Sequence, residues 1–159
     1  MTPTLILLLA LLIGVVSGLR SLTAPAVVAW GAHLGWLHFA GTRLAFMGSV
    51  AAVAVLSLLA LVELVTDKLP STPSRTAPVG LIARVVLGGF SGGVLYYAGS
   101  NQGFWLGAVV GVIGALIGTY GGNQVRTRSV KALHVPDFVI ALIEDAIAIG
   151  GAFYIVSRF

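Results

Sequence analysis

The sequence predicts an all-α integral membrane protein with about six transmembrane helices, some of them short or broken. Its composition, its regularly interrupted apolar segments and the charges between them all indicate this class. Of its 159 residues, 58% are hydrophobic and only 9% are charged. Soluble domains carry roughly 25% charged residues, so this chain could not cover a water-facing surface and its solvent must be lipid. We therefore expect the lipid bilayer as its main partner.

The remaining composition excludes several other classes of protein. The formal net charge is +4, but the basic residues lie in short connections between apolar segments, so no nucleic-acid partner is expected. The chain has no cysteine, which excludes disulfides, thiolate metal sites and thiol catalysis. Its three histidines are scattered. No metal site and no cofactor are therefore predicted.

Charges and prolines divide the chain, which we interpret as one membrane domain over residues 1–159, into apolar segments. They cover residues 5–19, 24–39, 44–66, 79–98, 103–122 and 138–157. A straight span needs about 20 residues, so the third to sixth segments are long enough. The first two are short, and we expect either two compact spans or helices broken inside the protein, with a re-entrant second segment as the alternative. The first has no basic flank and no clear cleavage site, which favours a membrane helix over a signal peptide.

The loop charges predict an orientation. With six spans, one side carries most of the basic residues, namely Arg20, Lys68, Arg75, Arg126, Arg128 and Lys131, with Arg84 just inside a helix. The other side carries only Arg43 and Arg158. The positive-inside rule then places the first, third and fifth connections in the cytoplasm and both termini outside.

Two short patterns recur in the same order and indicate an internal repeat. A Gly-x-x-Ser-Gly pattern covers residues 14–18, and a related Gly-Gly-x-Ser-Gly stretch covers residues 88–92; Ala-Leu-aliphatic-Glu ends at Glu63 and again at Glu144. Halves over residues 1–68 and 79–159, joined by a proline-rich cytoplasmic linker over 69–78, would each hold three spans. An odd number of spans per half predicts an inverted-topology repeat, the plan of many transporters. Glu63 and Glu144 lie at different depths of their segments, so the repeat would be imperfect.

Charged residues inside the apolar segments are the candidate functional residues. A charged side chain at the centre of a membrane helix costs about 2.5–3.5 kcal/mol, and such residues are usually functional. The predicted ion-binding or substrate-binding residues are Arg20, Glu63, Asp67, Arg84, Glu144 and Asp145. Glu144 and Asp145 are adjacent and point to neighbouring sectors of one helix, so one could pair with arginine while the other titrates or faces a cavity. The alternative is that all of them form buried ion pairs that fix helix register.

The connection after the third segment holds a second candidate site. Lys68, Ser74 and Arg75 could bind an anion such as a phosphate headgroup; the alternative is a rigid joint between the halves. Lys68 and Arg75 also match the opening of the lipid phosphatase signature, and Arg128 and His134 loosely match its last motif. The Pro-Ser-Gly-His element is missing, so we expect no catalytic residue and no enzyme activity.

The fifth segment carries glycines at Gly-xxx-Gly spacing, a pattern that brings helix backbones close together. These are Gly107, Gly111, Gly114, Gly118 and Gly122. The partner helix could belong to the same chain or to a second copy in a homodimer.

Several of these stretches also resemble a known family. They are residues 17–25, residues 67–78 with Asp-Lys-Leu-Pro and Pro-Ser-Arg-Thr-Ala-Pro, residues 80–84, and residues 144–151. Together they are similar to a bacterial inner-membrane family defined as domain of unknown function 4126. The resemblance covers nearly the whole chain and implies a small multi-pass protein of the bacterial inner membrane. It implies no catalytic or binding residues.

The charges and the repeat favour a small transporter or channel for an ion or a small polar or anionic solute. Arg20 and Arg84 would neutralise an anionic group or the carboxylates, and the acidic residues would bind a cation or a proton. The alternative is a non-transporting lipid-binding or assembly protein in which the buried charges are structural. A polar cavity would favour transport, and a dry cluster of paired charges would favour the structural role.

Overall fold

The computed structural model describes residues 1–68, 75–100 and 103–159, and over these ranges every regular element is a helix. The elements are α1 (Pro3–Leu19), α2 (Thr23–His33), the 3-10 helix η1 (Arg43–Gly48), α3 (Val50–Thr66), α4 (Pro78–Ser100), α5 (Phe104–Leu133) and α6 (Asp137–Val156). The predicted all-helical class is confirmed.

Three of the helices, α4, α5 and α6, are long and apolar enough to cross a membrane. The apolar helices α1 and α3 have 17 residues each. At 1.5 Å per residue such a helix rises about 25 Å, less than the roughly 30 Å of a bilayer core. The chain is therefore a membrane protein with helices of unequal length, and the number of six spans stays a prediction.

The second and third apolar segments are more broken than a continuous span would be. The helix α2 has 11 residues and ends at His33, so of the alternatives left open for residues 24–39 the broken helix describes this segment. Left-handed glycines at Gly35 and Gly41 turn the chain after α2. The third segment divides at Ser49, whose hydroxyl accepts a hydrogen bond from the Ala52 N–H at 3.1 Å and so begins α3 only there.

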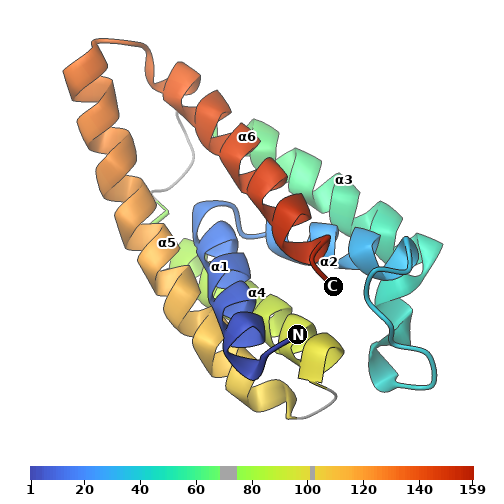
Figure 1. The fold of residues 1–159 in the computed structure, drawn as a ribbon. Coiled ribbons are helices and arrows are strands. Elements are labelled where there is room, and N and C mark those ends of the chain that lie inside the picture. The colour runs from blue at the N-terminus through green and yellow to red at the C-terminus, as the bar shows by residue number, and fades with distance from the viewer. Residues whose placement is uncertain (69–74, 101–102) are drawn as a thin grey trace.

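The helices α1, α4 and α5 pack against one another along much of their lengths and form the tightest part of the molecule (Figure 1). Glycines make this approach possible. A Cβ atom added to Gly14 would overlap the backbone of Gly111, and one added to Gly114 would overlap the backbone of α1. Small residues at helix crossings are the usual means of packing inside membranes, where no hydrophobic effect draws helices together.

The other helices form a second layer around α2 (Figure 1). Nearly all of α2 is buried. The helix α3 packs mainly on α2 and η1, and its outer face, with Leu58, Val62 and Val65, is exposed as a lipid-facing surface would be. The helix α6 packs on α2 and α1 but touches α5 sparsely, so α5 and α6 diverge.

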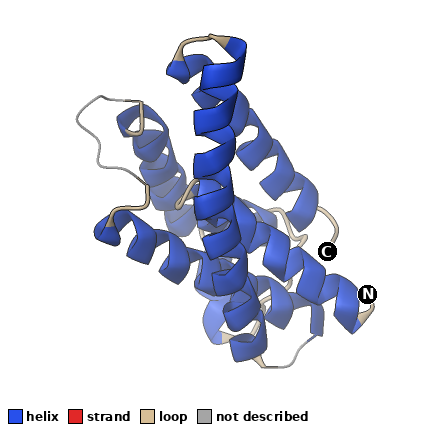
Figure 2. Cartoon of the chain, turned by 90° about the vertical axis from the view of Figure 1, so that its left-hand side faces the viewer, coloured by secondary structure: helices blue, strands red, loops and turns tan. Residues whose placement is uncertain are grey.

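One end of the molecule carries the C-terminal ends of α1 and α3 and the N-terminal end of α4, and the turn between α5 and α6 projects beyond them (Figures 1 and 2). The two chain termini lie near each other, away from this end. The helix α5 continues to Leu133, past the expected end at Gly122. Its last turns are polar and project beyond the bundle (Figure 2).

The three-plus-three repeat stays a prediction. In a duplicated fold, the pair α4–α5 would correspond to the pair α1–α2. The first pair packs closely, whereas the second makes few contacts.

Candidate functional site

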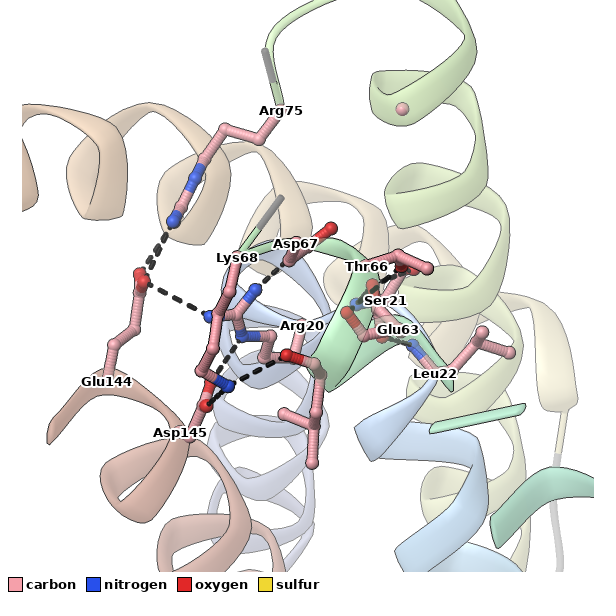
Figure 3. A network of polar contacts seen from close by, with 12 residues as sticks. Arg20, Ser21, Leu22, Glu63, Thr66, Asp67, Lys68, Arg75, Glu144 and Asp145 are labelled. Carbon is pink, nitrogen blue, oxygen red and sulfur yellow. Dashed lines mark hydrogen bonds and ion pairs between the residues drawn. The ribbon is translucent and has the colours of Figure 1, made fainter. Parts of the chain in front are cut away.

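All five acidic side chains of the chain lie together with five of its nine Lys and Arg residues. We call this group the charge cluster; its members are Glu63, Asp67, Asp137, Glu144, Asp145, Arg20, Lys68, Arg75, Arg84 and Arg126. The cluster lies at the end of the molecule where α1 and α3 finish, and most of its members are drawn in Figure 3. Its formal charges cancel.

Arg20 lies at the centre of the charge cluster, with a side chain that has 0% exposed surface. It caps the C-terminus of α1 in an extended conformation, which turns its side chain toward α3 and α6. Its Nε donates to Asp145 Oδ1 at 2.6 Å, and its Nη1 donates to Asp67 (Figure 3). Its Nη2 lies 4.0 Å from Glu144 Oε2. One side chain thus connects three helices.

The adjacent residues Glu144 and Asp145 point to neighbouring sectors of α6, so each has a cation of its own in addition to Arg20, which lies near both. Glu144 accepts two hydrogen bonds from Arg75, at 2.6 and 2.8 Å, in the bidentate geometry typical of strong Arg–carboxylate pairs. Asp145 accepts from Lys68 Nζ at 2.6 Å as well as from Arg20. Both carboxylates therefore have an arginine partner, and the expected titration of one of them stays a prediction.

Glu63 is held differently from the other acidic residues. Its two oxygens accept the backbone N–H groups of Ser21 and Leu22, both at 2.8 Å, and the Ser21 hydroxyl. No cation lies within ion-pair distance of Glu63 in the described ranges. The two N–H groups come just before α2, where the helix has unsatisfied donors and a positive dipole end. Glu63 of α3 therefore caps α2.

Arg84 and Asp67 lie beside this cap. Arg84 Nη2 is 3.6 Å from Asp67 Oδ2, and Arg84 Nη1 donates to the Gly80 carbonyl at 3.1 Å. Asp67 thus faces both Arg20 and Arg84, the two basic partners that the sequence proposed for the acidic residues of this segment.

The sequence interpretation missed Arg126 and Asp137 as members of the charge cluster. Arg126 Nε donates to Asp137 Oδ1 at 2.9 Å, and Arg126 Nη1 lies 3.5 Å from Glu144 Oε2. The α5–α6 hairpin turns at His134, which adopts a left-handed conformation (φ 52°). The sequence held a signal for this pair, because Arg126 and Asp137 have opposite charges and lie on the two sides of a turn that contains Pro136.

Of the three residues predicted to bind an anion, the structure describes Lys68 and Arg75. Lys68 and Arg75 contact Asp145 and Glu144, so the chain itself supplies anions to both cations. Ser74 lies outside the described residues. Arg128 and His134, which an enzyme site would need, are exposed and make no ion pair in the part of the chain that the structure describes.

The glycines of α5 have two kinds of neighbours, packed helices and the charge cluster. Four of them, Gly107, Gly111, Gly114 and Gly118, are buried and pack against α4 or α1 of the same chain. Gly122 lies next to Leu19, Arg75 and Glu144 and so borders the charge cluster.

A groove of about 520 Å³ reaches the charge cluster from the side, between α1, α5 and α6. We call it the α1–α5–α6 groove. Its walls are apolar and include Val15, Leu19, Ile117, Ile140, Ile143 and Ile147. Its polar lining comes from Arg126, Ser129 and Glu144. This arrangement can hold an amphiphilic molecule, with an apolar part in the groove and a polar part at the cluster end.

Comparison with known proteins identifies the chain at the level of its family. No curated protein and no solved structure matches it. A family model matches residues 7–157, which is nearly the whole chain. The chain belongs to the family described as Domain of unknown function (DUF4126).

Proposed function

We propose that the protein is a non-transporting, lipid-binding component of the bacterial inner membrane, in which the charge cluster is structural. The observation that carries this proposal is the pairing of Arg20: a guanidinium with 0% exposed surface lies between carboxylates from two other helices. Because the ten charges cancel, the cluster neutralises itself without a solute ion. The proposal assigns no catalytic residue.

The energetics of buried ion pairs fit this role. Removing one partner of a buried pair costs about 3–5 kcal/mol because the other charge is left uncompensated, whereas removing both partners costs far less. The helix α3 packs on α2 and η1 and makes few other helix contacts, so Asp67 and Lys68 supply much of what attaches its C-terminal end to α1 and α6. In this role the charges fix the position of a helix.

The α1–α5–α6 groove supports lipid as the ligand. A site for a polar solute needs polar groups around the solute, whereas this groove is apolar over most of its length. It also lies between the two helices that diverge, so a molecule could enter from the bilayer itself.

A double-mutant cycle tests the structural role. We expect Arg75→Met and Glu144→Met each to lower the free energy of unfolding in detergent micelles by about 3–5 kcal/mol, and the double variant to lose much less than the sum of the two. Additive losses would contradict the proposal, because they would mean that the two charges do not stabilise each other.

Transport of an ion or small polar or anionic solute is the second candidate. Two observations favour it: Glu144 lines the groove, and Glu63 has no cationic partner in the described ranges. Transport would agree with an inverted repeat, with a homodimer and with termini on the outer side, all of which stay predictions. Proton and alkali-ion flux in proteoliposomes tests it. A flux that Glu144→Gln and Asp145→Asn both abolish, in variants whose thermal unfolding shows that they are still folded, would establish transport through the cluster. No flux, or a flux that neither variant changes, would exclude it.

A further inference from the structure

We infer that the α1–α5–α6 groove binds an anionic phospholipid, with an acyl chain between α5 and α6 and the phosphate at Arg126 and Ser129. This inference rests on the proposed lipid-binding function and names the class of lipid. Three features of the groove support it: its shape, the donors at its polar end and the charge around that end.

The shape of the groove suits a flexible hydrocarbon chain. Its volume of about 520 Å³ lies within the roughly 300–1,000 Å³ of ligand sites in proteins. Ile117 and Gly121 of α5 face Ile143 and Ile147 of α6 across it. Gly121 of α5 has no side chain and leaves room in the groove, since a Cβ atom added there would meet no other atom within 4 Å.

The polar end of the groove offers hydrogen-bond donors for a phosphate. A guanidinium has five N–H groups, and Arg126 uses three of them on Asp137 and Glu144, which leaves two. The Ser129 hydroxyl also lines the groove and makes no hydrogen bond within the described part of the chain. A phosphate diester can accept from both residues while the Arg126–Asp137 pair stays intact.

The charge around this end favours an anionic over a zwitterionic headgroup. All five acidic residues are already engaged in the charge cluster, so Arg128, exposed one turn from Val125 at the flank of the groove, has no carboxylate partner among the described residues. Basic residues near the cytoplasmic membrane surface attract anionic lipids. A zwitterionic headgroup would bring its own cation close to Arg128.

The same helix end provides a matched control. Lys131 has no groove-lining residue next to it or one turn away along α5, whereas Arg128 is next to Ser129 and one turn from Val125. Replacing Arg128 or Lys131 changes the net charge equally, but only Arg128 flanks the groove.

The experiment compares phosphatidylglycerol with phosphatidylcholine of identical acyl chains, added to the delipidated full chain in detergent. Bound lipid is counted by native mass spectrometry. We expect phosphatidylglycerol to bind about tenfold more tightly, which corresponds to about 1.4 kcal/mol. Arg128→Gln and Ser129→Ala should each reduce this preference severalfold, and Lys131→Gln should leave it unchanged.

A second pair of variants tests the site independently of charge. Gly121→Leu places an apolar side chain in the groove at a position where an added Cβ atom meets no other atom within 4 Å, and we expect it to abolish the binding of phosphatidylglycerol. Gly150→Leu, at another open glycine on α6 outside the groove, should not. The thermal unfolding temperature of both variants without lipid shows whether they fold.

The outcomes separate the inference from the function on which it rests. No binding of either lipid would overturn both. Equal binding of both lipids that Gly121→Leu abolishes would overturn the inference and leave the lipid-binding function standing. Phosphatidylglycerol binding that Gly121→Leu does not change would overturn the inference, because the site would lie elsewhere. Glycerol 3-phosphate that binds as tightly as phosphatidylglycerol would overturn the phospholipid as the occupant.

Discussion

The guanidinium of Arg20 lies between Asp67 of α3 and Asp145 of α6, with no exposed surface. Such a side chain is costly to bury alone and stable only with its partners. We expect Arg20→Ala to lower the free energy of unfolding by about 3–5 kcal/mol, because two carboxylates lose their shared cation. Chemical unfolding in detergent micelles measures it.

The control for this prediction is Arg43→Ala, which removes an exposed basic residue outside the charge cluster. Exposed substitutions of this kind change stability by no more than about 0.5 kcal/mol. If the two variants were equally stable, the pairs around Arg20 would contribute nothing to the fold.

Glu63 is the acidic residue whose partners are N–H and O–H groups rather than a cation. Glu63→Gln keeps one acceptor oxygen and replaces the other with an NH₂ group, which would face a backbone donor. We expect a loss of about 1–3 kcal/mol, the cost of leaving a buried donor unsatisfied. Thermal unfolding in micelles reports this loss.

The matched control is Asp137→Asn, the same change of acid to amide at a carboxylate whose side chain is 61% exposed. Exposed ion pairs contribute about 0–1 kcal/mol, so this variant should lose less than Glu63→Gln. The reverse order would show that Glu63 does not cap α2.

At the scale of helices, the crossing of α1 and α5 depends on glycine. A Cβ atom at Gly114 would overlap the backbone of α1, and backbone cannot move away as a flexible side chain can. We expect Gly114→Ala to lower stability by about 1–3 kcal/mol through overpacking, with a lower thermal unfolding temperature.

Gly150→Ala is the control for the same substitution in a helix. An added Cβ atom meets nothing within 4 Å there, so the higher helix propensity of alanine should leave stability unchanged or raise it by up to about 1 kcal/mol. Destabilisation by Gly150→Ala in the membrane would instead indicate a second chain packed on this face.

At the scale of the whole molecule, the loop charges predict which end faces the cytoplasm. The chain has no cysteine, so single cysteines report accessibility directly. We expect Lys131→Cys to react with an impermeant maleimide only in broken cells, and Arg43→Cys to react in intact cells, because the basic end of the bundle faces inward. Labelling of both positions from the same side would refute the three crossings that are expected between residues 43 and 131.

Sequence reasoning reached the class of the protein and most of its helices. Composition alone requires a lipid environment, and continuous apolar segments require helices there, since backbone groups in lipid must be satisfied within the segment. The boundaries of α1 and α6 follow closely from their charges and prolines. The break after α2 could not be predicted in this way, because the stretch is apolar and nothing in the sequence around its two left-handed glycines marks them as turns.

The candidate residues of the charge cluster were predicted from the sequence because charge in a membrane segment is costly wherever it lies. Their pairing was not, since it depends on which helices are neighbours. Lys68 and Arg75 looked available for an external anion, and only the packing of α6 shows that Asp145 and Glu144 already contact them. Arg126 joins the cluster because the α5–α6 hairpin brings Glu144 of α6 back toward α5.

Residue types alone thus predict a helical membrane protein with charges inside its apolar segments, because the cost of transferring a side chain into lipid depends first on its type. Three further properties appear only once the helices are packed: α2 is short, the charges pair with one another, and an apolar groove reaches them between α5 and α6. These properties depend on distances between residues far apart in the chain, which no local pattern specifies.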